Sequence, residues 1–284
     1  MSAIAYLAGG SNRPPLSQVG VWLNDPSNWT GPNGLLFHLR QHVVYTVVAV
    51  VIALLIALPI GLLVGHTGRG AFLVGGLANG LRAVPSLGLV VLLVVWLSPK
   101  IHLLQSVPGV VEHRGALPYL IPVEIVLVLL AIPPILTNTY AGVQNVDPAA
   151  RDAARGMGMT GGQVVRKVEF PCALPLIMSG LRSSVLQVIA TATIAAYAPF
   201  LGALGSFIVN GAQVINDPHS GYPAMVGAGI VVAALALVAE MSLILVQRYV
   251  VSRGISGRYS RRTAGVQASG ASVAGVEMAG VVRS

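Results

Sequence analysis

The sequence predicts an all-α membrane protein with about five membrane-spanning helices. Hydrophobic residues make up 55% of the 284 residues, and charged residues make up only 9%. A soluble globular domain carries about 25% charged residues, so a soluble fold of this length would lack the charge to cover its surface. The mean hydropathy of +0.78 supports the same interpretation.

Five long apolar runs give the approximate positions of the spans. The clearest is the segment 43–65, which contains no charged residue. As a helix it would be about 34 Å long, enough to cross a hydrocarbon core of about 30 Å. The other four predicted spans cover residues 72–97, 119–143, 176–204 and 223–250. Several contain proline, which membrane helices tolerate better than soluble helices do.

Two flanking segments lack such runs. Residues 1–38 contain two tryptophans, and we expect an extracytoplasmic or interfacial segment there. The first dozen residues lack the basic region and apolar core of a signal peptide, so the first span would act as an uncleaved insertion signal. Residues 39–250 form the predicted transmembrane domain. Residues 251–284 are rich in Gly, Ala, Ser and Val, and we expect a flexible basic tail near anionic lipid headgroups.

The distribution of basic residues predicts the orientation in the membrane. With five spans, the 66–70 turn, the 142–175 loop and the segment after residue 247 share one side. That side carries Arg69, Arg151, Arg155, Arg166, Lys167, Arg248, Arg253, Arg258, Arg261, Arg262 and Arg283. The opposite side carries only Arg13, Arg40, Lys100 and Arg114. Basic residues concentrate in cytoplasmic loops, so we expect the N-terminus outside and the C-terminus in the cytoplasm. The net charge of +8 therefore indicates topology rather than nucleic-acid binding.

The segment 142–175 is the one long polar connection between spans. Asp147 followed by Pro148 is typical of a helix start, with Asp as the cap and Pro at the first helical position. The run 149–155 favours helix, and the glycines that follow it favour a turn. A second helical pattern covers 163–170, and we expect Pro171 and Pro175 to end it. Such a helix and turn would form a docking element, whereas the alternative is a connector that only lies on the membrane.

The same segment resembles the coupling loop of ABC-importer permeases, the EAA loop. That motif is Glu-Ala-Ala, three residues, Gly, nine residues, then Ile-x-Leu-Pro. The chain has the same spacing, with Asp for Glu, Val for Ile and Phe for Leu. The matching residues are Asp152, Ala153, Ala154, Gly158, Val168, Phe170 and Pro171. Softer similarities to the osmoprotectant subfamily lie at 82–87, 181–193 and 202–208, so the resemblance covers about residues 39–250.

The resemblance implies a type I ABC-importer permease arrangement and a set of partners. In that family the loop seats in a groove on a cytoplasmic ATPase, so Asp152, Ala153, Ala154, Gly158, Val168 and Pro171 would form or shape the ATPase-coupling site. A small residue at Gly158 would allow a sharp turn. The further partners implied are an extracytoplasmic solute-binding protein, a second permease copy or close relative, and membrane lipid.

The sequence also lacks several motifs of catalysis and metal binding. A Walker A motif needs a Gly-Lys pair, but Lys100 and Lys167 follow Pro99 and Arg166. ATP would therefore be bound by a separate subunit, and we expect no cofactor in this chain. No catalytic constellation stands out, so we do not expect an enzyme. Cys172 stands alone, and the pair at His38 and His42 is more typical of a solvated boundary than of a metal site.

Four ionisable residues fall within the predicted spans: Arg82, Glu124, Arg182 and Glu240. A charge at the centre of a membrane helix costs about 2.5–3.5 kcal/mol, so each needs an explanation. They either line the solute pathway or form structural ion pairs between helices. Arg82 and Glu240 lie deepest and could pair, whereas Arg182 is expected near the membrane boundary.

We therefore expect an ABC permease subunit for a small osmoprotectant such as glycine betaine, choline, carnitine or a proline-type solute. Aromatic residues make up 6% of the chain, too few in the spans for a tight cation–π cage. Specificity would then lie in the binding protein. The alternatives are a permease for another small solute, such as an amino acid, and a polytopic anchor that recruits a cytoplasmic protein.

Overall fold

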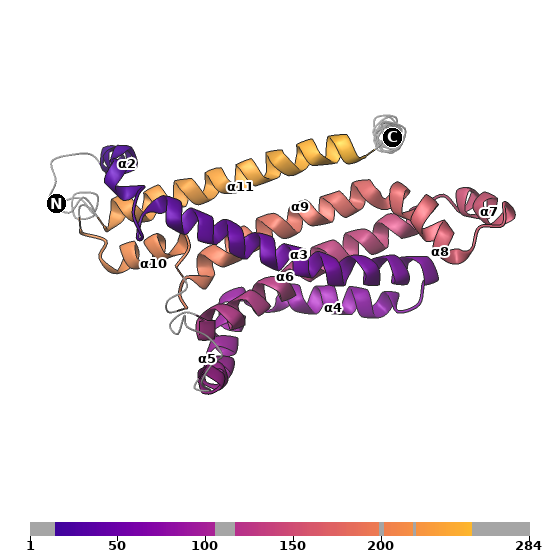
Figure 1. Cartoon of the computed structure of the whole chain (residues 1–284), viewed down its shortest axis with the longest axis horizontal. Coiled ribbons are helices and arrows are strands. Elements are labelled where there is room, and N and C mark those ends of the chain that lie inside the picture. The colour runs from indigo at the N-terminus through magenta and orange to yellow at the C-terminus, as the bar shows by residue number, and fades with distance from the viewer. Residues whose placement is uncertain (1–14, 106–116, 199–201, 218–219, 252–284) are drawn as a thin grey trace, which may run out of the picture.

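The computed structural model describes residues 15–105, 117–198, 202–217 and 220–251, and in these ranges it contains helices and no strand. Figure 1 shows them as an elongated bundle with the helices α7 and α8 at one end. The elements are α2 (Pro15–Asn24), η1 (Pro26–Asn28), α3 (Leu35–Thr67), α4 (Ala71–Ala83), α5 (Ser86–Gln105), α6 (Leu117–Gln144), α7 (Pro148–Gly156), α8 (Gly161–Val164), the π-helical turn η2 (Val165–Glu169), α9 (Phe170–Ala195), α10 (Gly205–Gln213) and α11 (Tyr222–Val250).

Four of the helical stretches in the described ranges are long and apolar enough to cross a membrane. They are Leu35–Thr67, Pro118–Gln144, Gly161–Ala195 and Tyr222–Val250. A fifth span exists if the bent pair α4 and α5 is counted as one. The predicted all-α membrane fold with about five spans is therefore confirmed.

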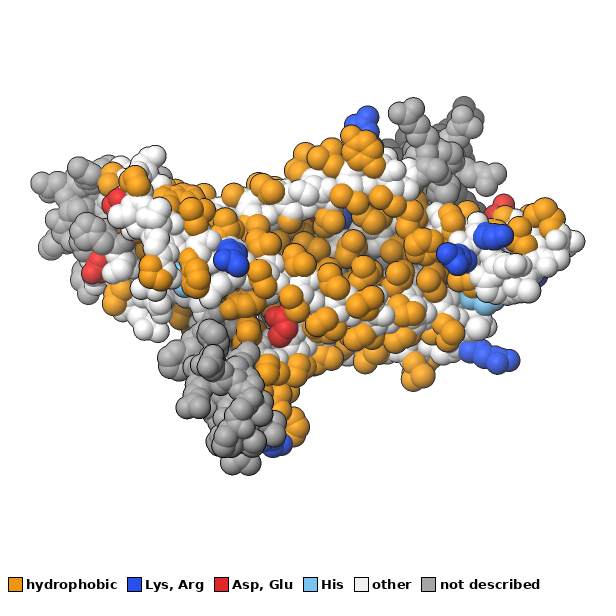
Figure 2. Space-filling view, viewed as in Figure 1, with side chains coloured by type: hydrophobic (Ala, Val, Ile, Leu, Met, Phe, Trp, Pro, Cys, Tyr) orange, Lys and Arg blue, Asp and Glu red, His pale blue; other side chains and the backbone are white. Residues whose placement is uncertain are grey.

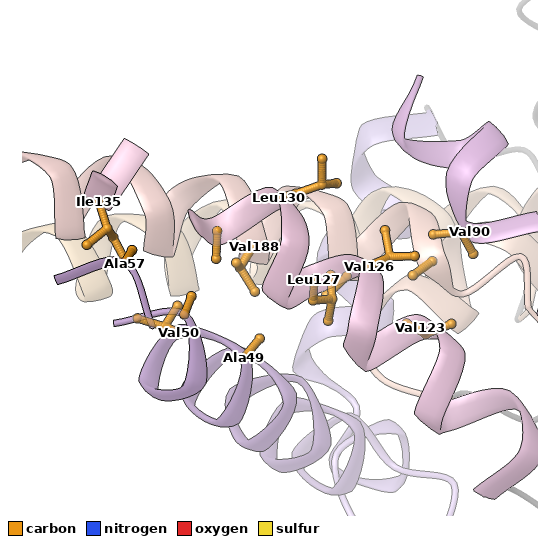
Figure 3. Close-up of a cluster of buried hydrophobic side chains, with 14 of the residues drawn as sticks. Ala49, Val50, Ala57, Val90, Val123, Val126, Leu127, Leu130, Ile135 and Val188 are labelled. Atoms are coloured by element: carbon orange, nitrogen blue, oxygen red, sulfur yellow. The ribbon is translucent and has the colours of Figure 1, made fainter. Parts of the chain in front are cut away.

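The helices α3, α6 and α9 form the core of the bundle. Small residues of α3 lie against larger apolar residues of α6 and α9. Figure 3 shows Ala49 and Ala57 of α3 beside Leu127 and Ile135 of α6 and Val188 of α9, and all five side chains are buried. Small side chains let backbones approach closely, which is how helices associate in lipid without a hydrophobic driving force.

Glycines bring these helices still closer together. A Cβ atom at Gly61 would lie 2.7 Å from the Cβ of Thr139, and one at Gly65 would lie 2.7 Å from the Cβ of Val143. Between α6 and α9, a Cβ at Gly180 would lie 2.7 Å from the Cβ of Asn138. The close contact between α3 and α6 therefore continues to the end of the bundle that carries α7.

The second predicted span, 72–97, is not one straight helix. Val84 adopts an extended backbone conformation between α4 and α5. The residue before a proline is driven out of the helical region, so Pro85 ends α4 at Ala83. The axes of the two helices differ by 88°, and α5 leaves the bundle sideways (Figure 1).

The fourth predicted span, 176–204, lies in a helix that begins earlier and ends earlier than the span. Pro171 and Pro175 do not end a helix, because α8, η2 and α9 form one continuous helical segment from Gly161 to Ala195. Pro171 falls in the first turn of α9, directly after the π-helical turn, where a missing N–H does least harm. At the other end the helix stops at Ala195, and α10 follows separately.

The opposite end of the bundle is closed by α2, α10 and the first turns of α3 and α11. Trp22 of α2 is 6% exposed, and its ring packs on Gly227 of α11, where a Cβ would lie 2.5 Å away. The ring also meets Phe207 of α10 edge to face at 5.9 Å between centroids. The segment 15–24 is thus a helix packed on protein. The predicted tail lies outside the described residues from position 252 onward.

Candidate functional site

The helix α7 begins where the sequence predicts. The side chain of Asp147 accepts a hydrogen bond from the N–H of Ala149 at 3.0 Å, and Pro148 takes the first helical position. An N-cap of this kind satisfies a backbone donor that has no partner inside the helix. The predicted start of this short helix is confirmed.

Gly158 ends α7 in a Schellman motif. Its φ of 81° is left-handed, which glycine adopts without a steric penalty. The N–H of Met159 donates to the carbonyl of Ala154 at 3.2 Å, and the N–H of Gly158 donates to the carbonyl of Arg155 at 2.9 Å. The sharp turn predicted at Gly158 is confirmed, and it returns the chain toward the bundle.

The three residues at the start of the motif face in different directions. Asp152 and Ala153 are exposed, and the Asp152 side chain lies 3.8 Å from Arg155 in an exposed pair. Ala154 is 1% exposed and faces the protein. The short helix therefore presents one acidic and one small side chain outward and uses the second alanine for packing.

The second half of the motif lies in the continuous helix that follows. Thr160 and Gln163 form a capping box, and Val164 is fully buried. Val168 and Pro171 are half-buried in η2 and the first turn of α9. These two residues lie at the base of the element, whereas Asp152, Ala153 and Gly158 lie on its outer surface.

A buried carboxylate ties this element to the bundle. Glu169 of η2 is 0% exposed. Its Oε2 lies 2.8 Å from Nδ1 of His66, in the last turn of α3, and its Oε1 lies 3.0 Å from Nε of Arg151 on α7. Arg151 also donates to the carbonyl of Val143 near the end of α6. We call Arg151, Glu169 and His66 the ion triad.

Sequence reasoning missed the ion triad. Glu169 occupies the variable position of the motif, between Val168 and Phe170. An acidic residue flanked by apolar residues just before a membrane helix was the one available signal. Its partners could not be read from the sequence, because His66 lies 103 positions away and only the folded bundle brings it close.

One ion pair joins the outer helix α11 to the core. Arg182 of α9 donates to Oε1 of Glu240 of α11 through Nε at 2.9 Å, and to Oε1 of Gln247 at 3.3 Å. Glu240 is thus held by Arg182, whereas the sequence left a pairing with Arg82 open. Arg182 lies well inside the continuous helix rather than near its start, because that helix begins at Gly161. The Arg82 side chain lies outside what the structure describes.

The remaining candidates have different surroundings. Both carboxylate oxygens of Glu124 are buried and accept no hydrogen bond from the described residues. His42 is fully buried with Nε2 3.1 Å from the carbonyl of Ile189, and His38 meets Phe207 edge to face with 5.1 Å between ring centroids. The two histidines are thus engaged separately. Within the described ranges, no group of three His, Cys, Asp or Glu residues could hold a metal ion.

The sequence is similar to those of known transport permeases. The carnitine transport permease protein OpuCB of Listeria monocytogenes is 39% identical over 147 residues, which cover 50% of this chain and 65% of that protein. The glycine betaine/carnitine/choline transport system permease protein OpuCB of Bacillus subtilis is 30% identical over 161 residues, which cover 55% and 71%. The chain thus spans slightly less than two thirds of the Listeria protein.

A solved structure shares the fold. The inward-facing MetNI methionine ABC transporter contains a chain that superposes with a TM-score of 0.58 at 20% identity, covering 77% of this chain and 96% of that one. The family model for the binding-protein-dependent transport system inner membrane component matches residues 57–253, a stretch that includes α7, Gly158 and the ion triad. The chain therefore belongs to the family of inner-membrane components of binding-protein-dependent transport systems.

Proposed function

We propose that this chain is the permease subunit of an ATP-driven importer for a small quaternary ammonium osmoprotectant such as glycine betaine, carnitine or choline. ATP is bound by a separate subunit, and the chain itself carries out no bond chemistry. The fold and the family membership support a permease. The solute class comes from the relatives in Listeria and Bacillus, which are permeases for carnitine and for glycine betaine, carnitine and choline.

The main support for the proposal is the structure of α7: its position at one end of the bundle, its capped ends and its exposed side chains. A capped helix of nine residues stands at one end of the bundle, ends in a glycine turn and presents Asp152 and Ala153 to solvent. Its inner side is fixed to the bundle by Ala154 and the ion triad. A small exposed side chain beside a charge suits close contact with another protein, so we assign this face to the ATPase.

The orientation follows from the end on which α7 lies. The α3–α4 turn and the C-terminal end of α11 lie at the same end of the bundle as α7 (Figure 1). This grouping agrees with the excess of basic residues counted on that side. We propose that this end faces the cytoplasm, with the N-terminus and α2 outside, where a solute-binding protein would dock.

A second permease copy or a close relative would complete the pathway. Figure 2 shows a broad apolar surface along the middle of the molecule, with few charged side chains. Exposed apolar residues of α11 such as Leu237, Val238 and Met241 belong to such a surface. Lipid covers part of it, and the second permease subunit would cover the rest.

Reconstituted transport tests the function. The chain, its ATPase and its binding protein would be placed in proteoliposomes, and ATP-dependent uptake of radiolabelled choline, carnitine, glycine betaine and proline would be measured in competition. We expect uptake of at least one quaternary ammonium solute that requires ATP and the binding protein.

Two results would contradict the proposal. Uptake of methionine or another amino acid without uptake of a quaternary ammonium solute would support the alternative permease, whose fold the MetNI match also represents. Retention of the cytoplasmic partner with no uptake of any solute would support a membrane anchor.

A further inference from the structure

Glu169 is an unusual residue for its position. It is a fully buried carboxylate beside an apolar cluster that includes the buried residues Val143, Ala173 and Ile177. Removing an ionised group from water costs several kcal/mol unless its partners are well placed. Oε2 is hydrogen-bonded to Nδ1 of His66 at 2.8 Å, whereas Oε1 lies 3.0 Å from Nε of Arg151 in an ion pair without a hydrogen bond. The charge is therefore stable only while the elements that carry these partners stay in place.

The ion triad joins three separate parts of the chain. Arg151 belongs to the docking helix α7, Glu169 to the helical segment that continues into α9, and His66 to the last turn of α3. The same end is tied by the side chain of Gln144, which donates to the carbonyl of Gly65 at 2.7 Å. Movement of α7 away from the bundle would therefore separate Arg151 from the buried Glu169.

The geometry points to Glu169 as a positioning residue for energy coupling, through which movement of α7 on the ATPase is transmitted to the end of α3. This inference rests on the proposed function. The family motif accounts for the outward face of α7, whereas the ion triad lies on the inward side and contacts core helices. Two discrete arrangements of such a buried contact would give the bundle two states rather than a continuous range.

A buried ion pair that only stabilises the fold would behave differently. Loss of a purely stabilising contact lowers the amount of assembled complex but leaves each assembled complex with its normal transport. Loss of a transmitting contact leaves ATP hydrolysis intact and lowers the number of solute molecules imported per ATP hydrolysed. This ratio, measured on assembled complexes, separates the two roles.

The experiment compares Glu169→Gln, His66→Ala and His66→Gln in the reconstituted complex of permease, ATPase and binding protein. We expect Glu169→Gln and His66→Ala to lower the ratio of solute imported to ATP hydrolysed about tenfold, within the range of typical coupling energies. His66→Gln keeps an N–H donor for Glu169, so it should restore most of the ratio. Arg69→Gln, which changes an exposed residue three positions from His66, is the matched control and should leave the ratio unchanged.

Each outcome decides the inference. An assembled Glu169→Gln complex with the wild-type ratio would overturn it, and so would equal loss in His66→Ala and His66→Gln. If the complex with Glu169→Gln does not assemble, His66→Ala tests the inference instead. The His66 side chain is 21% exposed, so its loss disturbs folding less than loss of the buried Glu169. Failure of both variants to assemble would also overturn the inference, since the triad would then only hold the fold. Absence of uptake by the wild-type complex would instead contradict the proposed function.

Discussion

Gly158 shows how one backbone conformation determines the end of α7. Its φ is 81°, yet an added Cβ would meet no atom within 4 Å. The residue is therefore required for its backbone conformation and not for space. A larger side chain would act on the turn, with no direct clash at the docking surface.

This distinction gives a testable pair of variants. Gly158→Ala forces a side chain into the left-handed region, at a cost of about 1–2 kcal/mol. If the turn unwinds to relieve that cost, affinity for the ATPase falls about tenfold, since 1.4 kcal/mol is a factor of ten. Gly156→Ala is the matched control, because Gly156 is helical with open space around it. Equal affinities of the two variants in a co-purification or titration assay would contradict the role of the turn.

Gly65 depends on space rather than on conformation. A Cβ there would lie 2.7 Å from the Cβ of Val143, so Gly65→Ala must push α3 away from α6. Overpacking of this kind costs about 1–3 kcal/mol. We expect a lower thermal unfolding midpoint for the purified chain in detergent. Gly76→Ala on α4 has no atom within 4 Å of the new Cβ and should unfold at the wild-type temperature or slightly above.

At the scale of elements, an ion pair between Arg182 and Glu240 links α9 to α11. Glu240→Leu leaves the guanidinium of Arg182 without its carboxylate, which costs about 1–3 kcal/mol. The double variant Arg182→Met with Glu240→Leu removes both charges and should be more stable than the single variant. Thermal unfolding of wild type, both single variants and the double variant measures the coupling. Simple addition of the two single effects would show that the pair contributes nothing.

The sequence was sufficient to predict elements whose cause is local. Apolar runs of membrane-spanning length predicted the spans, and Asp147, Pro148 and Gly158 predicted a short capped helix with a turn. The continuity of the loop helix 163–170 with the fourth span was missed because a proline was interpreted as a stop, although the helix passes through Pro171 after a π-helical turn. Local rules describe isolated helices, and packing in the bundle overrides them.

The partners of buried charges could not be predicted for a different reason. Glu240 pairs with Arg182 because α11 lies along α9, an arrangement set by the packing of whole helices. The same holds for Glu169 and His66, which belong to helices far apart in the sequence. Spacing along one helix constrains neighbours on that helix, but it contains no information on which other helix faces it.

For the whole molecule, the orientation in the membrane is the main untested prediction. Asn33 and Arg69 are exposed residues just beyond the two ends of α3, so they mark opposite ends of the bundle. In a Cys172→Ser background, we expect Asn33→Cys to react with a membrane-impermeant maleimide in intact cells. Arg69→Cys should react only after the membrane is permeabilised. The reverse pattern would invert the topology and exclude a cytoplasmic α7.

The continuous helix from Gly161 to Ala195 determines where the ATPase would meet the membrane. Its 35 residues rise about 52 Å, whereas the hydrocarbon core is about 30 Å thick. Counted from Ala195, the helix crosses the hydrocarbon core by about residue 175. The remaining residues back to Gly161 extend roughly 20 Å beyond it. The ATPase would therefore contact the part of this helix that lies outside the lipid. A small tilt of the helix there would also move its other end, inside the membrane.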